Sequence, residues 1–323
     1  MNKNFLKKVL KIIKRCFRGI YRIFFEKPVI LYKIRGCPAI NEFKLNEYYF
    51  EHKYNFLDYY PALLKNKVNK AKKIYKRVVE FDKNGIPMLK GFEQKYWPVT
   101  IIQYGLLNYN YYLTYKKEYY RKNVLKICDW LIDNISTQGA WEHLIKYHSN
   151  VTNEDILPPY SSAMVQGEAI SLLVRGYFLN KKETYIECAG KAMLPYKIEV
   201  SKGGVLELIN NMPFYEEYPT KTPSHVLNGF MFSLFGLYDL SQIDCSFSKE
   251  AKELFDSGVQ TLIKVLPLYD GGFCSRYDLS YITAPPHNDN KNPFYHFIHV
   301  NQLIAINSVV NSEIIKFYID EWK

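Results

Sequence analysis

Hydrophobic residues divide the helical stretches of this chain into two kinds. Residues 162–177 and 226–240 are apolar on nearly every face, which indicates helices surrounded by protein. Within 226–240, Gly229 and Gly236 share one face, where the missing side chains would let a neighbouring helix approach closely. The stretches that follow, expected to form amphipathic helices, are 182–196 and 248–266.

Pairs of helical stretches are also expected before and after this central part of the chain. Residues 97–115 and 119–135 show helical periodicity, and 294–310 with 313–322 form two final helices. An inner and an outer ring of helices would give this alternation. We therefore predict a mainly α fold, an α/α barrel (toroid) with short β-hairpins at the cleft.

Short strands are expected between the helices. Residues 78–89 alternate around an Asn-Gly dipeptide, which favours a β-hairpin. A short strand is expected at 203–209 and a strand or hairpin at 271–281. The pair Thr222 and Pro223 predicts a capped helix that begins at Pro223.

The net charge of +11 is concentrated at the N-terminus. Residues 1–36 hold eleven of the 43 Lys and Arg residues and one of the 32 acidic residues, so the rest of the chain is nearly neutral. A neutral body argues against nucleic acid as a partner. Within 1–36, apolar residues recur at helical spacing among the cations, which favours an amphipathic helix on an anionic membrane surface. A solvated N-terminal arm is the alternative.

These observations divide the chain into a basic amphipathic tail, 1–36, and a single domain, 37–323. No stretch reaches about 18 uninterrupted apolar residues, which argues against a spanning helix. The six cysteines lack CxxC spacing, which argues against a zinc site and fits reduced thiols. We expect a cytoplasmic protein held peripherally at the inner membrane face.

Three polar clusters stand at or just before the ends of the expected elements. A lone tyrosine is usually structural, but three loop-edge tyrosines beside charged or imidazole groups favour a functional site. The two histidines of the last cluster share a helical face but have no third ligand in a recognisable pattern, so we predict no metal. No phosphate-binding glycine motif is present, and we predict no cofactor. The clusters are Tyr215-Glu216-Glu217-Tyr218, Arg276-Tyr277-Asp278, and Tyr295-His296 with His299 and Asn301-Gln302.

Longer motifs resemble the C-terminal domain of the D-glucuronyl C5-epimerase family. The resemblance is strongest over 160–323. It implies an α/α barrel in this part of the chain, an enzyme that makes L-iduronic acid within heparan-type polysaccharides, and, because animal members dimerise, a homodimer. The matching segments are SAMVQGEAISLLVRGY (162–177), YEEYPTKTPSHVLNGFMFSLFGLYDL (215–240), LPLYD…YDL (266–279) and YHFIHVNQL (295–303), with a weaker match in WPVTIIQYGL (97–106).

The chain departs from the animal members of the family in two places. Those members have a β-sandwich between the QYGL and SAM motifs, whereas about 55 residues fill this interval here. The basic residue that follows their YDL motif is Ser280 in this chain. This puts in doubt a contact to a substrate carboxylate or sulfate at that position.

The resemblance also implies site residues. Glu217 and Tyr218 of EEYPT, Tyr277 of YDL and Tyr295 of YHxxH match the positions of the family's catalytic residues. The residues expected to bind substrate are Gln103, Tyr104, Gln166, Arg175, Tyr215, Arg276, His296 and His299.

Epimerisation at C5 of a glucuronate removes a weakly acidic proton beside a carboxylate and returns one to the opposite face, so two proton-transfer groups must flank the ring. We predict that Glu217 or Tyr218 serves one face, and Tyr277 or Tyr295 the other. A tyrosinate base would need neighbours that lower its pKa from about 10, and Arg276, His296 and His299 are available for this. Donors must stabilise the charge on the carboxylate, and those expected are Arg276, His296 or Arg175.

The nearly neutral body favours an unsulfated uronate polymer, such as a heparosan-like bacterial capsule polysaccharide, over a highly sulfated one. Two alternatives stay open. A polysaccharide lyase would abstract the same C5 proton but release a product with a new double bond. A non-catalytic glycan-binding capsule protein would bind the polymer without any exchange at C5.

Overall fold

The computed structural model describes residues 54, 55, 57, 60, 79–91, 96–272, 274–284 and 290–323. Every described residue belongs to one compact unit, Phe50–Lys323. The tail predicted for 1–36 lies outside the described residues. Among the described residues, no helix is both long enough and apolar enough to cross a membrane.

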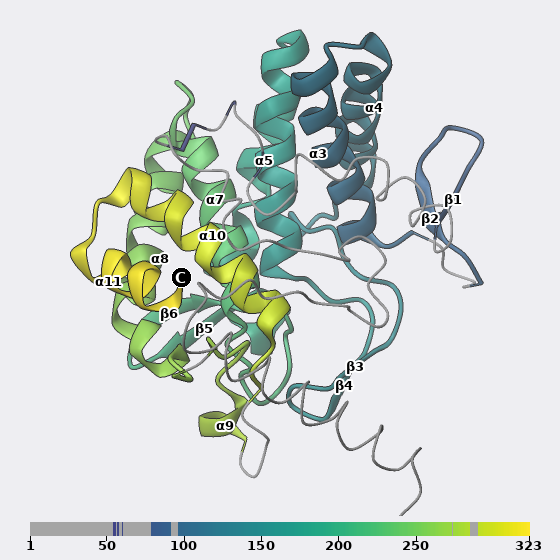
Figure 1. Cartoon of the computed structure of the whole chain (residues 1–323). Coiled ribbons are helices and arrows are strands. Elements are labelled where there is room, and N and C mark those ends of the chain that lie inside the picture. The colour runs from purple at the N-terminus through teal and green to yellow at the C-terminus, as the bar shows by residue number, and fades with distance from the viewer. Residues whose placement is uncertain are drawn as a thin grey trace, which may run out of the picture. The chain divides into compact units, whose positions relative to one another are not determined.

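The long helices of the described part form two layers (Figure 1). The inner layer is α3 (Pro98–Tyr115), α5 (Ala163–Asn180), α7 (Leu227–Ser241) and α10 (Pro293–Val310), packed side by side in that order. The outer layer is α4 (Glu118–Asn134), α6 (Thr184–Lys191), α8 (Ser248–Tyr269) and α11 (Glu313–Trp322), each against the inner helix that precedes it. The predicted mainly α fold is confirmed, and its long helices alternate between an inner and an outer layer as expected.

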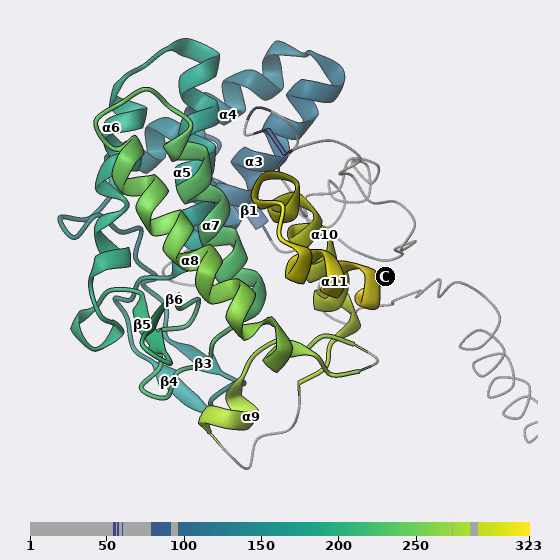
Figure 2. The ribbon, with the colours of Figure 1, turned by 90° about the vertical axis from the view of Figure 1, so that its left-hand side faces the viewer.

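Burial follows the sequence pattern in both layers. Every residue of α5 from Ala163 to Gly176 is buried, and α7 is buried along almost its whole length. In α8, by contrast, buried residues recur three to four positions apart at Phe255, Val259 and Leu262, which gives a single apolar face. Figure 2 shows α8 lying along α7 with its other face outward.

The two central helices, α5 and α7, touch backbone to backbone. A Cβ atom on Gly236 would overlap the backbone of Gly167, and one on Gly167 would overlap the backbone at Phe232 and Ser233. The predicted close approach is therefore present at Gly236. Gly229 differs, because the space beside it is filled by the side chain of Glu217 and not by a neighbouring helix.

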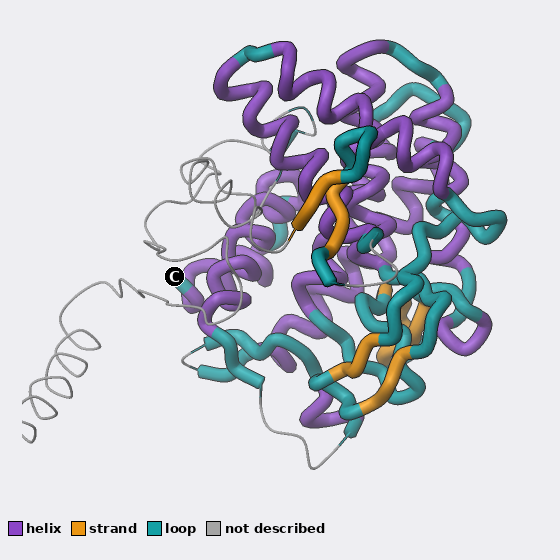
Figure 3. Tube along the Cα trace, turned by 90° about the vertical axis from the view of Figure 1, so that its right-hand side faces the viewer, coloured by secondary structure: helices purple, strands orange, loops and turns teal. Residues whose placement is uncertain are grey.

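The strands form three antiparallel hairpins, shown in orange in Figure 3. Two of them, β3–β4 and β5–β6, gather with the short helix α9 (Ser280–Thr283) at one end of the helix pairs. The first hairpin matches the one expected over 78–89, whereas the second was missed. The hairpins are β1 (Val79–Phe81) with β2 (Pro87–Leu89), β3 (Tyr147–Ser149) with β4 (Glu154–Ile156), and β5 (Leu206–Ile209) with β6 (Met212–Tyr215). The short 3-10 turns η2 (Leu194–Lys197) and η3 (Val200–Lys202) precede β5.

The strand or hairpin expected at 271–281 is absent from its described residues. The backbone there bonds to several different segments instead of one strand: Arg276 N donates to Tyr269 O, and Tyr277 N donates to Asn290 O. A hairpin needs one continuous partner, and here only an isolated bridge between Arg276 and Lys291 forms. The alternating pattern therefore produces an irregular segment followed by α9.

An ion pair lies inside the helix layers. The guanidinium group of Arg175 on α5 is 2.6 Å from the carboxylate of Asp239 on α7, and both side chains have 0% exposure. Arg175 also donates to Ser171 O and to the Tyr54 hydroxyl, each at 3.0 Å. The structure therefore places Arg175 in the core, where its donors hold protein groups rather than a substrate carboxylate.

We expect Asp239→Ala to lower the free energy of unfolding by about 3–5 kcal/mol, because it leaves a buried guanidinium without its counter-charge. The matched control is Glu250→Ala, which breaks the exposed pair with Lys197 and should cost about 1 kcal/mol or less. Urea titrations followed by circular dichroism measure both values. Equal losses in the two variants would contradict this account.

Candidate active site

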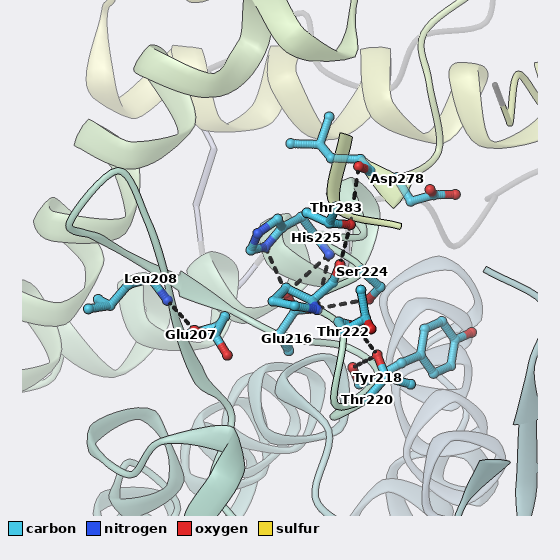
Figure 4. Close-up of polar contacts among 12 residues, drawn as sticks. Glu207, Leu208, Glu216, Tyr218, Thr220, Thr222, Ser224, His225, Asp278 and Thr283 are labelled. Atoms are coloured by element: carbon cyan, nitrogen blue, oxygen red, sulfur yellow. Dashed lines mark hydrogen bonds and ion pairs between the residues drawn. The ribbon is translucent and has the colours of Figure 1, made fainter. Parts of the chain in front are cut away.

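The loop between β6 and α7 is organised by the carboxylate of Glu216 (Figure 4). This buried group accepts hydrogen bonds from Ser224 Oγ at 2.8 Å and from His225 N at 3.1 Å. His225 Nδ1 lies 2.7 Å from the same carboxylate, and His225 O accepts from the Tyr269 hydroxyl at 2.6 Å. Glu216 is therefore a structural clamp that closes the loop.

This clamp explains why α7 begins at Leu227 and not at Pro223 as predicted. Ser224 and His225 bind Glu216, and His225 takes a left-handed conformation with φ of 49°. That conformation is incompatible with a right-handed helix. The pair Thr222 and Pro223 favours a helix start, but the hydrogen bonds to the Glu216 carboxylate keep the following residues out of the helix.

The loop in turn holds the segment that carries Tyr277. Leu227 N donates to Tyr277 O, and Leu279 N donates to Ser224 O, both at 3.0 Å. These two backbone bonds place residues 277–279 against residues 224–227. The two sequence motifs that hold Tyr218 and Tyr277 are thereby brought together.

Glu217 follows the clamp and lies against the first turn of α7. Its side chain fills the space beside Gly229, where a Cβ atom would overlap it. Asn228 Nδ2 lies 3.4 Å from Glu217 Oε2. Burial raises the pKa of Glu217 to about 7, an effect that hydrogen bonding by Tyr218 and Asn228 partly offsets. This carboxyl group can therefore gain or lose a proton near neutral pH.

Three tyrosines form a connected cluster that adjoins this carboxyl group through Tyr218 and Tyr277. The hydroxyl oxygens of Tyr218 and Tyr277 are 3.5 Å apart, and the rings of Tyr277 and Tyr295 have centroids 4.2 Å apart. Val151, Val226 and Tyr277 form one buried apolar cluster, and Tyr218 and Tyr295 pack against it. The structure thus brings together the four residues to which the resemblance gave catalytic roles.

Burial raises the pKa values of Tyr218 and Tyr277 well above 10, and the nearby charge of Glu217 adds to the effect. Both groups are therefore neutral phenols at pH 7. The cationic neighbours that a tyrosinate base would need were expected to be Arg276 and the two histidines. The described contacts of these three residues lie elsewhere.

His296 and His299 converge on Ser275 instead of on the tyrosines. His296 Nδ1 accepts from Ser275 N at 2.9 Å, and His296 Nε2 faces Trp322 O at 2.9 Å, so this imidazole is neutral with its proton on Nε2. His299 Nδ1 is 2.8 Å from Ser275 Oγ. Burial lowers the pKa of each histidine. The pair anchors the segment just before Tyr277.

The other expected substrate-binding residues have structural contacts. Gln166 Nε2 donates to Gly139 O and Ala192 O, and Gln166 Oε1 accepts from Trp141 N. Tyr215 is buried and donates to Leu254 O. Arg276 stacks over the Tyr281 ring and donates to Asp270 O. Tyr104 is half-buried with its ring against Phe81, and Gln103 donates to the buried carboxyl group of Glu168 at 3.2 Å.

One site residue was missed in the sequence. The ring of Tyr147, on β3, stacks on Tyr218 with centroids 5.2 Å apart and planes 9° from parallel. Its hairpin lies outside the motifs that carry the resemblance, and no local pattern distinguishes it from the many other tyrosines. Among the described residues, no three potential metal ligands come together.

The fold and this cluster define a helical protein with a buried carboxyl group beside a group of phenols. Residues 134–323 match the family described as D-glucuronyl C5-epimerase C-terminus. The chain belongs to this family, so the resemblance seen in the motifs is confirmed.

Two relatives illustrate the match. A D-glucuronyl C5-epimerase of Caenorhabditis elegans is 36% identical over 230 residues, which cover 68% of this chain and 37% of that protein. An uncharacterised protein of Methanocaldococcus jannaschii is 28% identical over 168 residues, 51% of this chain and 52% of that protein. The chain thus spans about half the length of these relatives or less.

Two solved structures have a similar course of the chain. A family 76 glycoside hydrolase from a bovine Bacteroides thetaiotaomicron strain gives a TM-score of 0.49 at 13% identity, covering 76% of this chain and 52% of that one. A second family 76 enzyme of the same species gives 0.48 at 11% identity, covering 77% and 66%.

We predict that Gly229→Ala lowers the pKa of Glu217 from about 7 toward the ordinary glutamate value, because the new methyl group displaces the carboxyl group toward water. Carbon-13 NMR titration of labelled glutamate carboxyls measures this shift. Gly258→Ala is the control, since its methyl group would meet the Leu234 side chain on the other side of α7. An unchanged titration in Gly229→Ala would refute the assigned packing.

Proposed function

We propose that this chain is a polysaccharide C5-epimerase that converts D-glucuronate to L-iduronate within a heparosan-like polymer. Membership of the D-glucuronyl C5-epimerase family supports this function. The observation that carries it is the buried Glu217 carboxyl group, whose pKa lies near 7 and which adjoins the phenol pair of Tyr218 and Tyr277. An ionisable group near neutrality is what proton abstraction at pH 7 requires.

The distances within the cluster bear on which groups serve opposite faces of the sugar. Each reacting atom must lie about 3–3.5 Å from C5, so groups on opposite faces stand roughly 6–7 Å apart. The Tyr218 and Tyr277 hydroxyls are 3.5 Å apart, which is too close for such a pair. This argues against Tyr218 and Tyr277 as the opposing pair. Because the pKa of Glu217 is raised to about 7, we assign Glu217 to one face, and we assign Tyr295 to the other.

In the proposed mechanism, Glu217 takes the C5 proton, and the electron pair of the C–H bond moves toward the substrate carboxylate. Tyr295 then donates a proton to C5 from the opposite face. The neutral phenols of Tyr218 and Tyr277 would donate hydrogen bonds to the charge that develops on the carboxylate. Exchange of protons with solvent restores Glu217 and Tyr295, so no cofactor is consumed.

The substrate class follows from two observations. The family description names a glucuronyl epimerase, which supports a uronate-containing polysaccharide. Outside residues 1–36 the chain is nearly neutral, which suits an unsulfated polymer better than a sulfated one. A homodimer remains part of the proposal, on the family resemblance alone.

Incubation with heparosan in deuterated water tests the function. We expect deuterium at C5 and the appearance of L-iduronate without shortening of the polymer, and we expect Glu217→Gln and Tyr295→Phe each to slow exchange by at least about 100-fold. Tyr115→Phe, at an exposed tyrosine at the end of α3, serves as the control variant. A product that absorbs ultraviolet light would identify a lyase, and binding without exchange would identify a non-catalytic glycan-binding protein.

We also propose that residues 1–36 hold the protein at an anionic membrane surface, which would suit a cytoplasmic protein acting on a polymer made at the inner membrane face. Sedimentation with phosphatidylglycerol vesicles should capture the full chain at low salt and much less at about 0.5 M salt, because the attraction is electrostatic. Phosphatidylcholine vesicles are the control. Equal capture by both lipids, or capture of a chain lacking 1–36, would contradict this role.

A further inference from the structure

A second buried carboxyl group, Glu168 on α5, lies beyond the cluster described above. Its side chain is completely buried. Oε1 accepts a hydrogen bond from Gln103 Nε2 at 3.2 Å, whereas Oε2 has no hydrogen-bond partner among the described residues. A carboxylate buried with an unpaired oxygen is costly, so such a group tends to hold its proton.

The backbone contact between α5 and α7 brings Glu168 near Glu217. Gly167, directly before Glu168, packs against Phe232 and Ser233 of α7. Gly229, which lies against the Glu217 side chain, is one helical turn earlier on α7, a rise of about 5–6 Å. The two carboxyl groups therefore border the same part of the helix contact.

Resting on the proposed function, we propose that Glu168 is a positioning residue for proton transfer that acts through Glu217. While Glu168 holds its proton, the ionised Glu217 is the single negative charge of this pair of carboxyl groups. When Glu168 ionises, its additional negative charge opposes formation of the anionic intermediate.

The order of ionisation supports this role. Burial raises the pKa of Glu168 to about 8; hydrogen bonding by Gln103 lowers it, and the charge of Glu217 raises it further. The pKa of Glu217 is raised to about 7. Because the charge of Glu217 opposes ionisation of Glu168, we expect Glu217 to lose its proton first and Glu168 to follow at higher pH. Two neighbouring carboxyl groups whose pKa values are pushed apart can take different roles.

Other titratable groups face this pair. Glu216 adjoins Glu217 and is held by Ser224 and His225. The phenols of Tyr60, Tyr218 and Tyr277 interact with one or other carboxyl group, and burial raises the pKa of each well above 10. Because these phenols stay neutral, we expect the ionisation near pH 8 within this group to be that of Glu168.

The first test is the pH profile of C5 deuterium exchange on heparosan. In the wild-type chain we expect the rate to rise through about pH 7 and then to fall about tenfold as Glu168 ionises above pH 8. Glu168→Gln, which cannot ionise, should lose the fall and keep the rise. Asp155→Asn, an exposed carboxylate on β4 paired with Lys146, is the control and should keep both limbs.

An unchanged fall in Glu168→Gln would overturn the proposal. So would a loss of exchange by more than about 100-fold at every pH in a folded variant, because the carboxylate itself would then be needed. If wild-type enzyme shows no exchange at all, the proposed function fails instead.

The second test needs neither substrate nor a folded Glu168 variant. Infrared titration of the wild-type chain, labelled with carbon-13 at glutamate carboxyls, should show protonated carboxyl absorption that disappears in two steps near pH 7 and pH 8. Glu217→Gln should retain one of these steps. Finding no glutamate protonated above pH 7 would overturn the proposal irrespective of activity.

Discussion

The carboxylate of Glu216 accepts hydrogen bonds from Ser224 and His225, and the rest of the site depends on this closure. It ends β6, delays the start of α7 and gives Ser224 the position from which its carbonyl receives Leu279 N. Through that bond the segment of Tyr277 is brought to the loop of Tyr218. A residue with no direct part in the proposed proton transfer therefore sets the distances between those that take part.

The contact between α5 and α7 supplies the second constraint. Gly167 and Gly236 allow the helix backbones to touch. Glu217 is buried beside Gly229 on the same helix α7, and this burial raises its pKa. The Arg175–Asp239 ion pair joins the same two helices. Arg175 lies twelve residues after Ala163, the first residue of α5, which corresponds to a rise of about 18 Å along the helix. Charge is thus compensated at one end of the contact and left adjustable at the other.

The sequence predicted best what is local or periodic. The alternation of all-apolar and amphipathic stretches predicted the two helix layers, and the family motifs pointed to Glu217 and Tyr218. The motifs could not separate residues that touch the chemistry from residues that support it: Arg175, His296 and Gln166 are polar groups in apolar helices whether they bind substrate or protein. The hairpin of Tyr147 and the late start of α7 depend on tertiary partners that no local pattern reveals.

The ionisation of the cluster decides how the proposed mechanism would work. A tyrosinate base would need cations, yet the described partners of Tyr218 and Tyr277 are aromatic rings and Glu217. Such surroundings keep both phenols protonated and place the one ionisation near pH 7 on Glu217. Neutral donors also suit an anionic substrate without binding it tightly in the ground state, because their hydrogen bonds strengthen as charge develops. The burial that holds the helices together is therefore the same property that would assign Glu217 the role of base.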